Sequence, residues 1–429
     1  MRASRSRLMR TTRGRRTGRA IAAAALAGAL AFVTACGGGG GGPTWRGDSD
    51  KPGDAGPKAT AMITAPADGA TEVPAATDIT FTTANAMDTT VELTDAAGKA
   101  IEGALSEDGT SWLPAGQLAY GATYTATITA TGDDGKASTA SSTFTTMAKP
   151  EKQIRVSSFL GDGAVVGVGM PLIVKFSRAI PADHRADVQR RMTVQATPEQ
   201  EGIWHWVSGT EVRYRPKNFW QPNTKISYRV QAGGLPMGNG WYGRADLTVD
   251  LKIGPEVIMV VDDKTKQMTV TKNGQVIKTM PVSLGKASTP SSSGTMVVIE
   301  KLEKTIFDTY AELGPVDGYR TPIDFAQRLT WGGEFIHSAP WSVGDQGRRN
   351  VSHGCVNLSP ANAKWLFEQT RVGDPVTVKG TLRKLQNGNG WTDWNMSWEE
   401  YIKGSALPYE PPAAEPTEAA ADPSAGSDD

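Results

Sequence analysis

The sequence predicts a mainly β protein with two β-sandwiches, a third β-rich domain that contains one main helix, and a tryptophan-rich C-terminal segment. Two observations support this fold class. Residues 59–254 alternate apolar or β-branched residues with small polar ones in short runs, and Gly, Asp, Pro and Asn interrupt them at short intervals. This pattern is typical of sandwiches. Only residues 359–374 combine a helical pattern with clear start and stop signals.

The first 35 residues have the layout of a secretory signal. Residues 1–20 contain eight arginines and no acidic residue, and an apolar run follows at 21–33. This run is shorter than the ~20 residues that span a bilayer. It ends in Val33-Thr34-Ala35-Cys36, which resembles a bacterial lipobox, where a peptidase cuts before the cysteine and the new N-terminal residue is lipidated. We therefore expect a lipoprotein signal over 1–35 and lipid on Cys36. The alternative is an ordinary cleavage site beside a chance cysteine.

The charge balance excludes some partners. The chain has 45 basic and 45 acidic residues, but removing the signal leaves a net charge near −8. The tail, 409–429, has six acidic residues and no basic one, and we expect it to be disordered. The remainder has no excess of basic residues for nucleic acid, so no nucleic-acid partner is expected. Residues 36–58 contain six consecutive glycines and predict a flexible tether to the membrane.

The two sandwiches are assigned to residues 59–148 and 149–254. Runs such as "TYTATITATG" in the first and "ADLTVDLKIG" in the second are predicted strands. There is no Cys–Trp–Cys pattern, so each sandwich is immunoglobulin-like at most. No cluster of titratable residues stands out, and we interpret both as spacers. His184 and His205 are predicted to be structural or surface residues.

The third domain is assigned to residues 255–380. Around Asn273-Gly274, "KQMTVTKNGQVIKTM" predicts a hairpin with a two-residue turn. The helix should begin after Ser359 as N-cap and stop at Gly373. Residues 381–408 contain Trp391, Trp394 and Trp398, which we expect to pack against this domain.

Cys355 is the only cysteine besides Cys36, so lipidation would leave its thiol without a disulfide partner within the chain. An odd cysteine in an exported protein indicates intermolecular pairing or a reactive thiol. His337 and His353 lie within eighteen residues of Cys355. A cysteine nucleophile needs such a base, because a free thiol is only a few per cent ionised near neutrality. Gly354 leaves the neighbouring backbone uncrowded, so that amides could face an oxyanion.

Two other interpretations of Cys355 are possible from the residues alone. One Cys and two His could form a three-ligand zinc site, although no further ligand occurs at a typical spacing. The thiol could also be inert and buried. The flanking histidine and glycine favour a cysteine acyl-transfer site over both.

The pattern H-x14-S-H-G-C-x-N, from His337 to Asn357, resembles the signature of bacterial cell-wall L,D-transpeptidases. The wider stretch 316–367 and the whole domain plan, over roughly 59–408, are similar to the actinobacterial branch of that family. The sequence departs from that family at "KLEKTIFDTYAELGPVDG", where the family has its flap over the active site. The resemblance therefore does not predict which acceptors or inhibitors this protein prefers.

The resemblance implies catalytic roles for part of the motif. Cys355 would be the nucleophile and His337 the base and later acid, oriented by the main-chain carbonyl of Ser338. His353 and Gly354 would complete the catalytic segment. The substrate-binding residues that it implies are Tyr319, as a flap tyrosine assisting at the oxyanion, Gly332 and Gly333 at the donor strand edge, Trp341, Ser352 and Asn357.

The resemblance also implies a reaction. Cys355 would attack the third, diamino acid residue of a peptidoglycan tetrapeptide stem and release D-Ala. The side-chain amine of an acceptor stem would then take the acyl group, giving a 3→3 cross-link without a metal or organic cofactor. Carbapenem β-lactams would acylate the same thiol. The enzyme would act in the cell wall, extracytoplasmic and anchored by lipid to the outer face of the membrane.

Several alternatives share parts of this interpretation. Water as acceptor would make an L,D-carboxypeptidase, and a protein lysine would make a protein-anchoring transpeptidase. A lipid-anchored wall-binding module with a degenerate catalytic domain is a further alternative, which the intact Cys355 and His337 argue against. A general cysteine protease would need a different sequence around the thiol.

Overall fold

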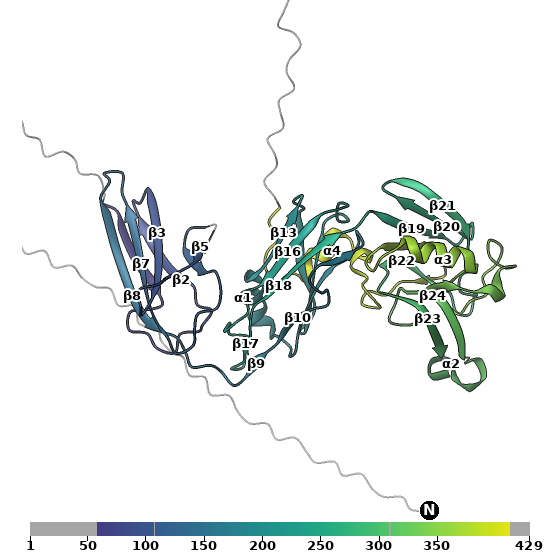
Figure 1. Ribbon diagram of the computed structural model, residues 1–429, viewed down its shortest axis with the longest axis horizontal. Helices are drawn as coiled ribbons and strands as arrows, with labels where there is room; N and C mark the ends of the chain where they lie inside the picture. The colour runs from purple at the N-terminus through teal and green to yellow at the C-terminus, as the bar shows by residue number, and fades with distance from the viewer. Residues whose placement is uncertain (1–57, 107, 309, 319, 412–429) are drawn as a thin grey trace, which may run out of the picture. The chain divides into compact units, whose positions relative to one another are not determined.

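The computed structural model describes residues 58–106, 108–308, 310–318 and 320–411 (Figure 1). The predicted mainly β fold is confirmed, because strands make up most of the regular structure in these residues. No helix in these ranges is long and apolar enough to cross a membrane.

The first sandwich encloses its core between two sheets. Ile79, Phe81 and Trp112 come from one sheet and Leu93 and Ile128 from the other, and all are buried together. This follows from the alternation seen in the sequence, since every second residue of a strand faces the same side. The sheet orders are β1-β2-β6-β5 and β4-β3-β7-β8, with strands β1 (Thr60–Ala65), β2 (Ile79–Ala84), β3 (Asp88–Asp95), β4 (Ala100–Ile101), β5 (Gly103–Leu105), β6 (Ser111–Pro114), β7 (Thr123–Thr131) and β8 (Ala137–Thr145).

The second sandwich has a larger aromatic core, which includes Trp204, Trp206 and Trp220. The orders of its main sheets are β10-β12-β15-β14 and β11-β18-β16-β13, and β9 pairs with β17 beside them. Its elements are β9 (Gln153–Ile154), β10 (Val156–Ser158), β11 (Ala164–Val166), β12 (Leu172–Phe176), η1 (Ala182–His184), α1 (Arg185–Arg190), β13 (Met192–Thr197), β14 (Gly202–Ser208), β15 (Glu211–Pro216), β16 (Lys225–Val230), β17 (Tyr242–Gly243) and β18 (Leu247–Ile253).

The third domain packs two sheets around helix α3 (Pro360–Gln369), which lies between them in Figure 1. Ala363 and Leu366 of α3 share one core cluster with residues of both sheets. The sheet orders are β21-β20-β19-β27-β22-β28 and β23-β24-β25-β26. The strands are β19 (Val257–Asp262), β20 (Gln267–Lys272), β21 (Gln275–Pro281), β22 (Ser292–Val297), β23 (Glu300–Asp308), β24 (Arg320–Arg328), β25 (Phe335–Ser338), β26 (Val356–Leu358), β27 (Pro375–Lys379) and β28 (Arg383–Lys384).

Helix α3 begins as predicted and ends earlier than predicted. Ser359 is the N-cap, and its side chain accepts a hydrogen bond from the amide of Asn362 at 3.3 Å. The helix stops at Gln369 rather than at Gly373, because Lys301 Nζ takes the carbonyls of Phe367 and Thr370 at 2.5 and 2.6 Å. The lysine ammonium donates to carbonyl oxygens that would otherwise accept hydrogen bonds from amides of a further helical turn.

The glycine at position 373 is required for a different structural reason. It has a φ of +94°, and a Cβ there would lie 2.6 Å from Cβ of Met170 in the second sandwich. Glycine is therefore needed for the close approach of two chain segments.

Two hairpins of the third domain are closed differently, one by a two-residue turn and the other by a short helix. Asn273 and Gly274 have φ values of +50° and +77° between β20 and β21, as the Asn-Gly pair predicts. The flap stretch forms β23, then α2 (Tyr310–Asp317), then β24, with α2 at the tip of the hairpin in Figure 1. Gly314 in α2 has a φ of +74° and interrupts the helical backbone before Pro315.

The C-terminal segment contains η3 (Asp393–Asn395), α4 (Trp398–Tyr401) and η4 (Ile402–Gly404). The sequence predicted that its tryptophans pack on the third domain, and the ring centroid of Trp391 does lie 6.3 Å from that of Trp331 there. The segment also contacts the second sandwich: Trp391 shares the core cluster of that sandwich, and Trp394 Nε1 donates to the carbonyl of Gly169 at 2.7 Å. His205, predicted to be structural or on the surface, stacks on Tyr401 with ring centroids 4.5 Å apart.

Replacing the N-cap of α3 should destabilise the third domain. We expect Ser359→Ala to lower the free energy of unfolding by about 1 kcal/mol, because the amide of Asn362 loses its acceptor. Urea unfolding followed by tryptophan fluorescence measures this change. Ser288→Ala, at an exposed serine, is the matched control. Equal midpoints for the two variants would contradict the capping role.

Candidate active site

The pairing of two short strands brings the predicted site residues together. β25 and β26 run parallel, with His337 opposite Asn357 in register. Cys355 directly precedes β26, so it lies at the end of the strand that neighbours the strand of His337. The thiol is 9% exposed, and its Sγ donates to the carbonyl oxygen of Gly333 at 3.7 Å. Residues eighteen positions apart in the chain thus share one end of one sheet.

His337 is held in a defined orientation. Its Nδ1 lies 2.8 Å from the carbonyl oxygen of Ser338, and a carbonyl can only accept a hydrogen bond. Nδ1 therefore carries the proton in the neutral ring, which leaves Nε2 able to accept one. The ring of Phe307 packs edge-on against the imidazole, with centroids 5.2 Å apart. This orientation is the arrangement that a general base requires.

Burial sets the protonation state of both groups. The imidazole of His337 is 3% exposed, and burial lowers its pKa to about 4 against the raising effect of the Ser338 hydrogen bond. Burial also raises the pKa of the Cys355 thiol to about 12; a backbone hydrogen bond from Phe335 opposes this, and the charge of Glu334 adds to it. The resting site therefore holds a neutral thiol and a neutral imidazole rather than an ion pair.

A side-chain turn fixes the backbone before the nucleophile. Ser352 Oγ accepts from the amide of Gly354 at 3.1 Å and donates to the carbonyl of Cys355 at 2.7 Å. Gly354 has a φ of +130°, which side chains rarely allow. The Gly354 amide, which the sequence suggested could face an oxyanion, is thus already engaged by Ser352.

His353 and Asn357 differ in their exposure. His353 is exposed, and its Nε2 lies 3.1 Å from Nζ of Lys286. Asn357 is buried, and its Nδ2 donates to Ser342 Oγ at 3.1 Å. Its Oδ1 is buried without a hydrogen-bond partner among the described residues. An acceptor in this state is suited to a donor group supplied by a ligand.

Gly332 and Gly333, predicted to be a strand edge that binds the donor, instead lie in a turn between β24 and β25, beside the thiol. The Gly332 amide donates to Oδ1 of Asn389 at 2.8 Å, and Gly333, with a φ of +86°, supplies the carbonyl that faces Cys355. Trp341 is 58% exposed, with its ring centroid 6.1 Å from that of His337. Tyr319 and Cys36 lie outside the described residues.

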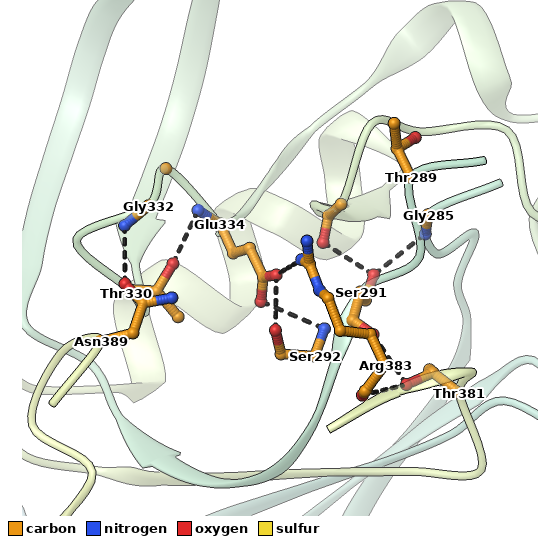
Figure 2. A network of polar contacts seen from close by, with 12 residues as sticks. Gly285, Thr289, Ser291, Ser292, Thr330, Gly332, Glu334, Thr381, Arg383 and Asn389 are labelled. Atoms are coloured by element: carbon orange, nitrogen blue, oxygen red, sulfur yellow. Dashed lines mark hydrogen bonds and ion pairs between the residues drawn. The ribbon is translucent and has the colours of Figure 1, made fainter. Parts of the chain in front are cut away.

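Sequence analysis missed several residues that support the site. Glu334 is buried and contacts Ser292 and Arg383, as Figure 2 shows, and Ser291 Oγ donates to the carbonyl of Gly354 at 2.7 Å. Ser342 supports Asn357. Each partner is distant in sequence, so no local spacing could have indicated the contact. Among the described residues, no group of three or more His, Cys, Asp and Glu side chains could hold a metal ion.

Comparisons with known proteins agree with this geometry. Residues 70–236 match the bacterial Ig domain family, and residues 256–378 match the L,D-transpeptidase catalytic domain family. L,D-transpeptidase 2 of Mycobacterium tuberculosis (strain CDC 1551 / Oshkosh) is 39% identical over 354 residues, which cover 82% of this chain and 85% of that protein. L,D-transpeptidase 5 of Mycobacterium tuberculosis (strain ATCC 25618 / H37Rv) is 35% identical over 370 residues, covering 84% and 80%.

A solved L,D-transpeptidase in complex with imipenem is 36% identical and covers 54% of this chain and 100% of its own, with a TM-score of 0.47. The extent and identity of the sequence matches, together with the cysteine and histidine geometry, show that this chain belongs to the L,D-transpeptidase family, which consists of acyltransferase-type enzymes.

Proposed function

We propose that this protein cross-links peptidoglycan stems through a thioester on Cys355. The observation that carries the proposal is the neutral, oriented imidazole of His337, whose Nε2 is left to accept a proton on the strand next to the nucleophile. Because the thiol has a pKa of about 12, it must lose its proton as it attacks.

The first half-reaction begins with the tetrapeptide donor stem bound against the Gly332-Gly333 turn, beside the thiol. The sulfur of Cys355 forms a bond to the carbonyl carbon of the third residue while the thiol proton passes to Nε2 of His337. The C–N bond to D-Ala then breaks, and the imidazolium returns the proton to the leaving amine.

The second half-reaction transfers the acyl group. The side-chain amine of an acceptor stem attacks the thioester carbonyl and gives its proton to His337. The C–S bond breaks, and the sulfur recovers the proton as a thiol. The product is a 3→3 cross-link. A carbapenem would enter at the first step, because the same sulfur can open its strained lactam amide.

We also propose that the chain is a lipoprotein on the outer face of the cell membrane. The basic, apolar and Val-Thr-Ala-Cys order of residues 1–36 supports this placement. Residues 37–58 would then act as a tether between the lipid and the folded domains.

Removing the nucleophile should remove all turnover. We expect residues 59–408 mixed with a disaccharide-tetrapeptide to gain the mass of the stem minus D-Ala, and Cys355→Ala to gain none while keeping its unfolding temperature. Intact-mass spectrometry and analysis of the released products measure this. A dimer supports cross-linking, whereas tripeptide alone would indicate a carboxypeptidase. No adduct and no released D-Ala from folded, reduced protein would favour the wall-binding alternative.

The acylation rate should depend little on pH near neutrality. The His337 base has a pKa of about 4, so it is already neutral between about pH 6 and pH 9, and the rate should fall only as pH drops toward 4. Stopped-flow acylation by the donor stem or imipenem measures this profile. A rate that rises about tenfold per pH unit across that window would instead indicate attack by a preformed thiolate.

Cys36 should determine membrane association. We expect the Cys36→Ser chain, expressed in an actinobacterial host, to leave the membrane fraction and to lose labelling by a radioactive fatty acid. Cell fractionation and fluorography test this, with Cys355→Ser as the control that keeps the lipid. Unchanged labelling of Cys36→Ser would contradict the lipoprotein proposal.

A further inference from the structure

Glu334 is a buried carboxylate that the reaction above does not use. It is 6% exposed and lies at the start of the segment that leads into β25. Its amide donates to Thr330 Oγ1 at 3.0 Å, and its carbonyl oxygen accepts from the amide of Leu329 at 2.9 Å. The backbone of Glu334 therefore closes the tight turn that contains Gly332 and Gly333.

The Glu334 side chain is held by two other strands. Ser292 of β22 donates to it twice, from Oγ at 2.9 Å and from its amide at 3.3 Å. Arg383 of β28 forms an ion pair with the same carboxylate. Ser292 and Arg383 are neighbours in register across β22 and β28. Figure 2 shows the carboxylate between these partners.

The same cluster holds the segment that carries the nucleophile. Ser291, next to Ser292, accepts from the amide of Gly285 at 2.9 Å and donates to the carbonyl of Gly354 at 2.7 Å. The position of a Cβ on Gly354 would lie 3.6 Å from Cγ of Glu334, which is ordinary packing contact. The space between Gly354 and the Glu334 side chain would thus admit no more than a methyl group, and the Gly354 carbonyl is bonded to Ser291.

These contacts link the two chain segments on either side of the thiol. The Gly333 carbonyl, one residue before Glu334, accepts from Cys355 Sγ, and the Gly354 carbonyl, one residue before Cys355, accepts from Ser291. We propose that Glu334 is a positioning residue for acylation: held by Ser292 and Arg383, it fixes the Gly332-Gly333 turn, whose Gly333 carbonyl accepts the thiol hydrogen bond, against the segment that carries Cys355. This inference rests on the proposed function.

The charge of Glu334 gives the proposal a second, independent readout. Burying a carboxylate is costly unless it is paired and hydrogen-bonded, and here Arg383 and Ser292 supply both. The charged or titratable groups around the thiol are Glu334 with Arg383, and His337 on the neighbouring strand; Lys286 and His353 lie on the exposed side of the segment. The negative charge of Glu334 helps to keep the pKa of the thiol high.

The test compares Glu334→Ala and Glu334→Gln in the full chain. With the disaccharide-tetrapeptide, we expect Glu334→Ala to acylate about tenfold to a hundredfold more slowly with KM changed by less than about twofold, because the reacting atoms are misplaced while the stem still binds. Glu334→Gln should recover most of the rate, since its amide can still accept from Ser292 Oγ and Arg383.

Alkylation of Cys355 by iodoacetamide provides the readout that a purely structural residue would not change. Glu334→Gln removes the negative charge, so alkylation should be about threefold or more faster at pH 9 than in the unchanged chain. Mass spectrometry of the tryptic peptides separates Cys355 from Cys36. Glu300→Gln is the matched control, because Glu300 also pairs with an arginine, Arg328, at 3.1 Å, and it is a surface pair outside this cluster.

Three results would overturn the proposal. The first is a Glu334→Ala chain that acylates at the unchanged rate. The second is an alkylation profile of Glu334→Gln that overlays that of the unchanged chain. The third is an equal loss of rate and unfolding temperature in both variants. If the unchanged chain forms no adduct with the stem, the proposed function fails, and the alkylation comparison, which needs no stem, decides the role of Glu334.

Discussion

The parallel pairing of β25 with β26 is the constraint on which the site depends. It places His337 opposite Asn357, and it puts Cys355 directly before the strand that neighbours the strand of His337. The pairing works only if β26 starts directly after the nucleophile. The Ser352 turn and the φ of +130° at Gly354 stop the chain from extending the strand earlier. The glycine and serine of the motif therefore shape the backbone, whereas the cysteine and histidine supply the thiol and the imidazole of the site.

Burial around this pairing determines how the nucleophile is activated. A thiol with a pKa of about 12 and an imidazole with a pKa of about 4 do not exchange a proton at rest. Thiolates are the form that oxidants attack, so a neutral resting thiol limits the oxidation of Cys355. The electrophile must supply the driving force, because proton transfer becomes favourable only as the C–S bond forms.

The hairpin at Asn273-Gly274 and the start of α3 could be predicted from the sequence, because each depends on local turn or capping chemistry. The spacing of Cys355 and His337 indicated a candidate nucleophile and base, and the structure places these residues on or directly before two neighbouring strands. The sequence did not allow the end of α3 to be predicted, since Lys301 reaches those carbonyls from another strand. The partners of Glu334 are 42 and 49 residues away, and nothing near Glu334 in the sequence indicates them. Local sequence patterns identify the candidate reacting residues, whereas contacts formed only in the tertiary fold determine which distant residues hold them in place.

The sequence suggested that the second sandwich is a spacer. The C-terminal segment shows that this sandwich also supports the site. Asn389 accepts a hydrogen bond from the amide of Gly332 in the turn beside the thiol, and Trp391 and Trp394, a few residues later, contact the second sandwich. Arg213 of that sandwich forms a buried ion pair with Asp393 at 2.9 Å. Removing one partner of such a pair is strongly destabilising, since it leaves a buried charge. The second sandwich thus anchors, through this segment, one of the hydrogen bonds that shape the Gly332-Gly333 turn.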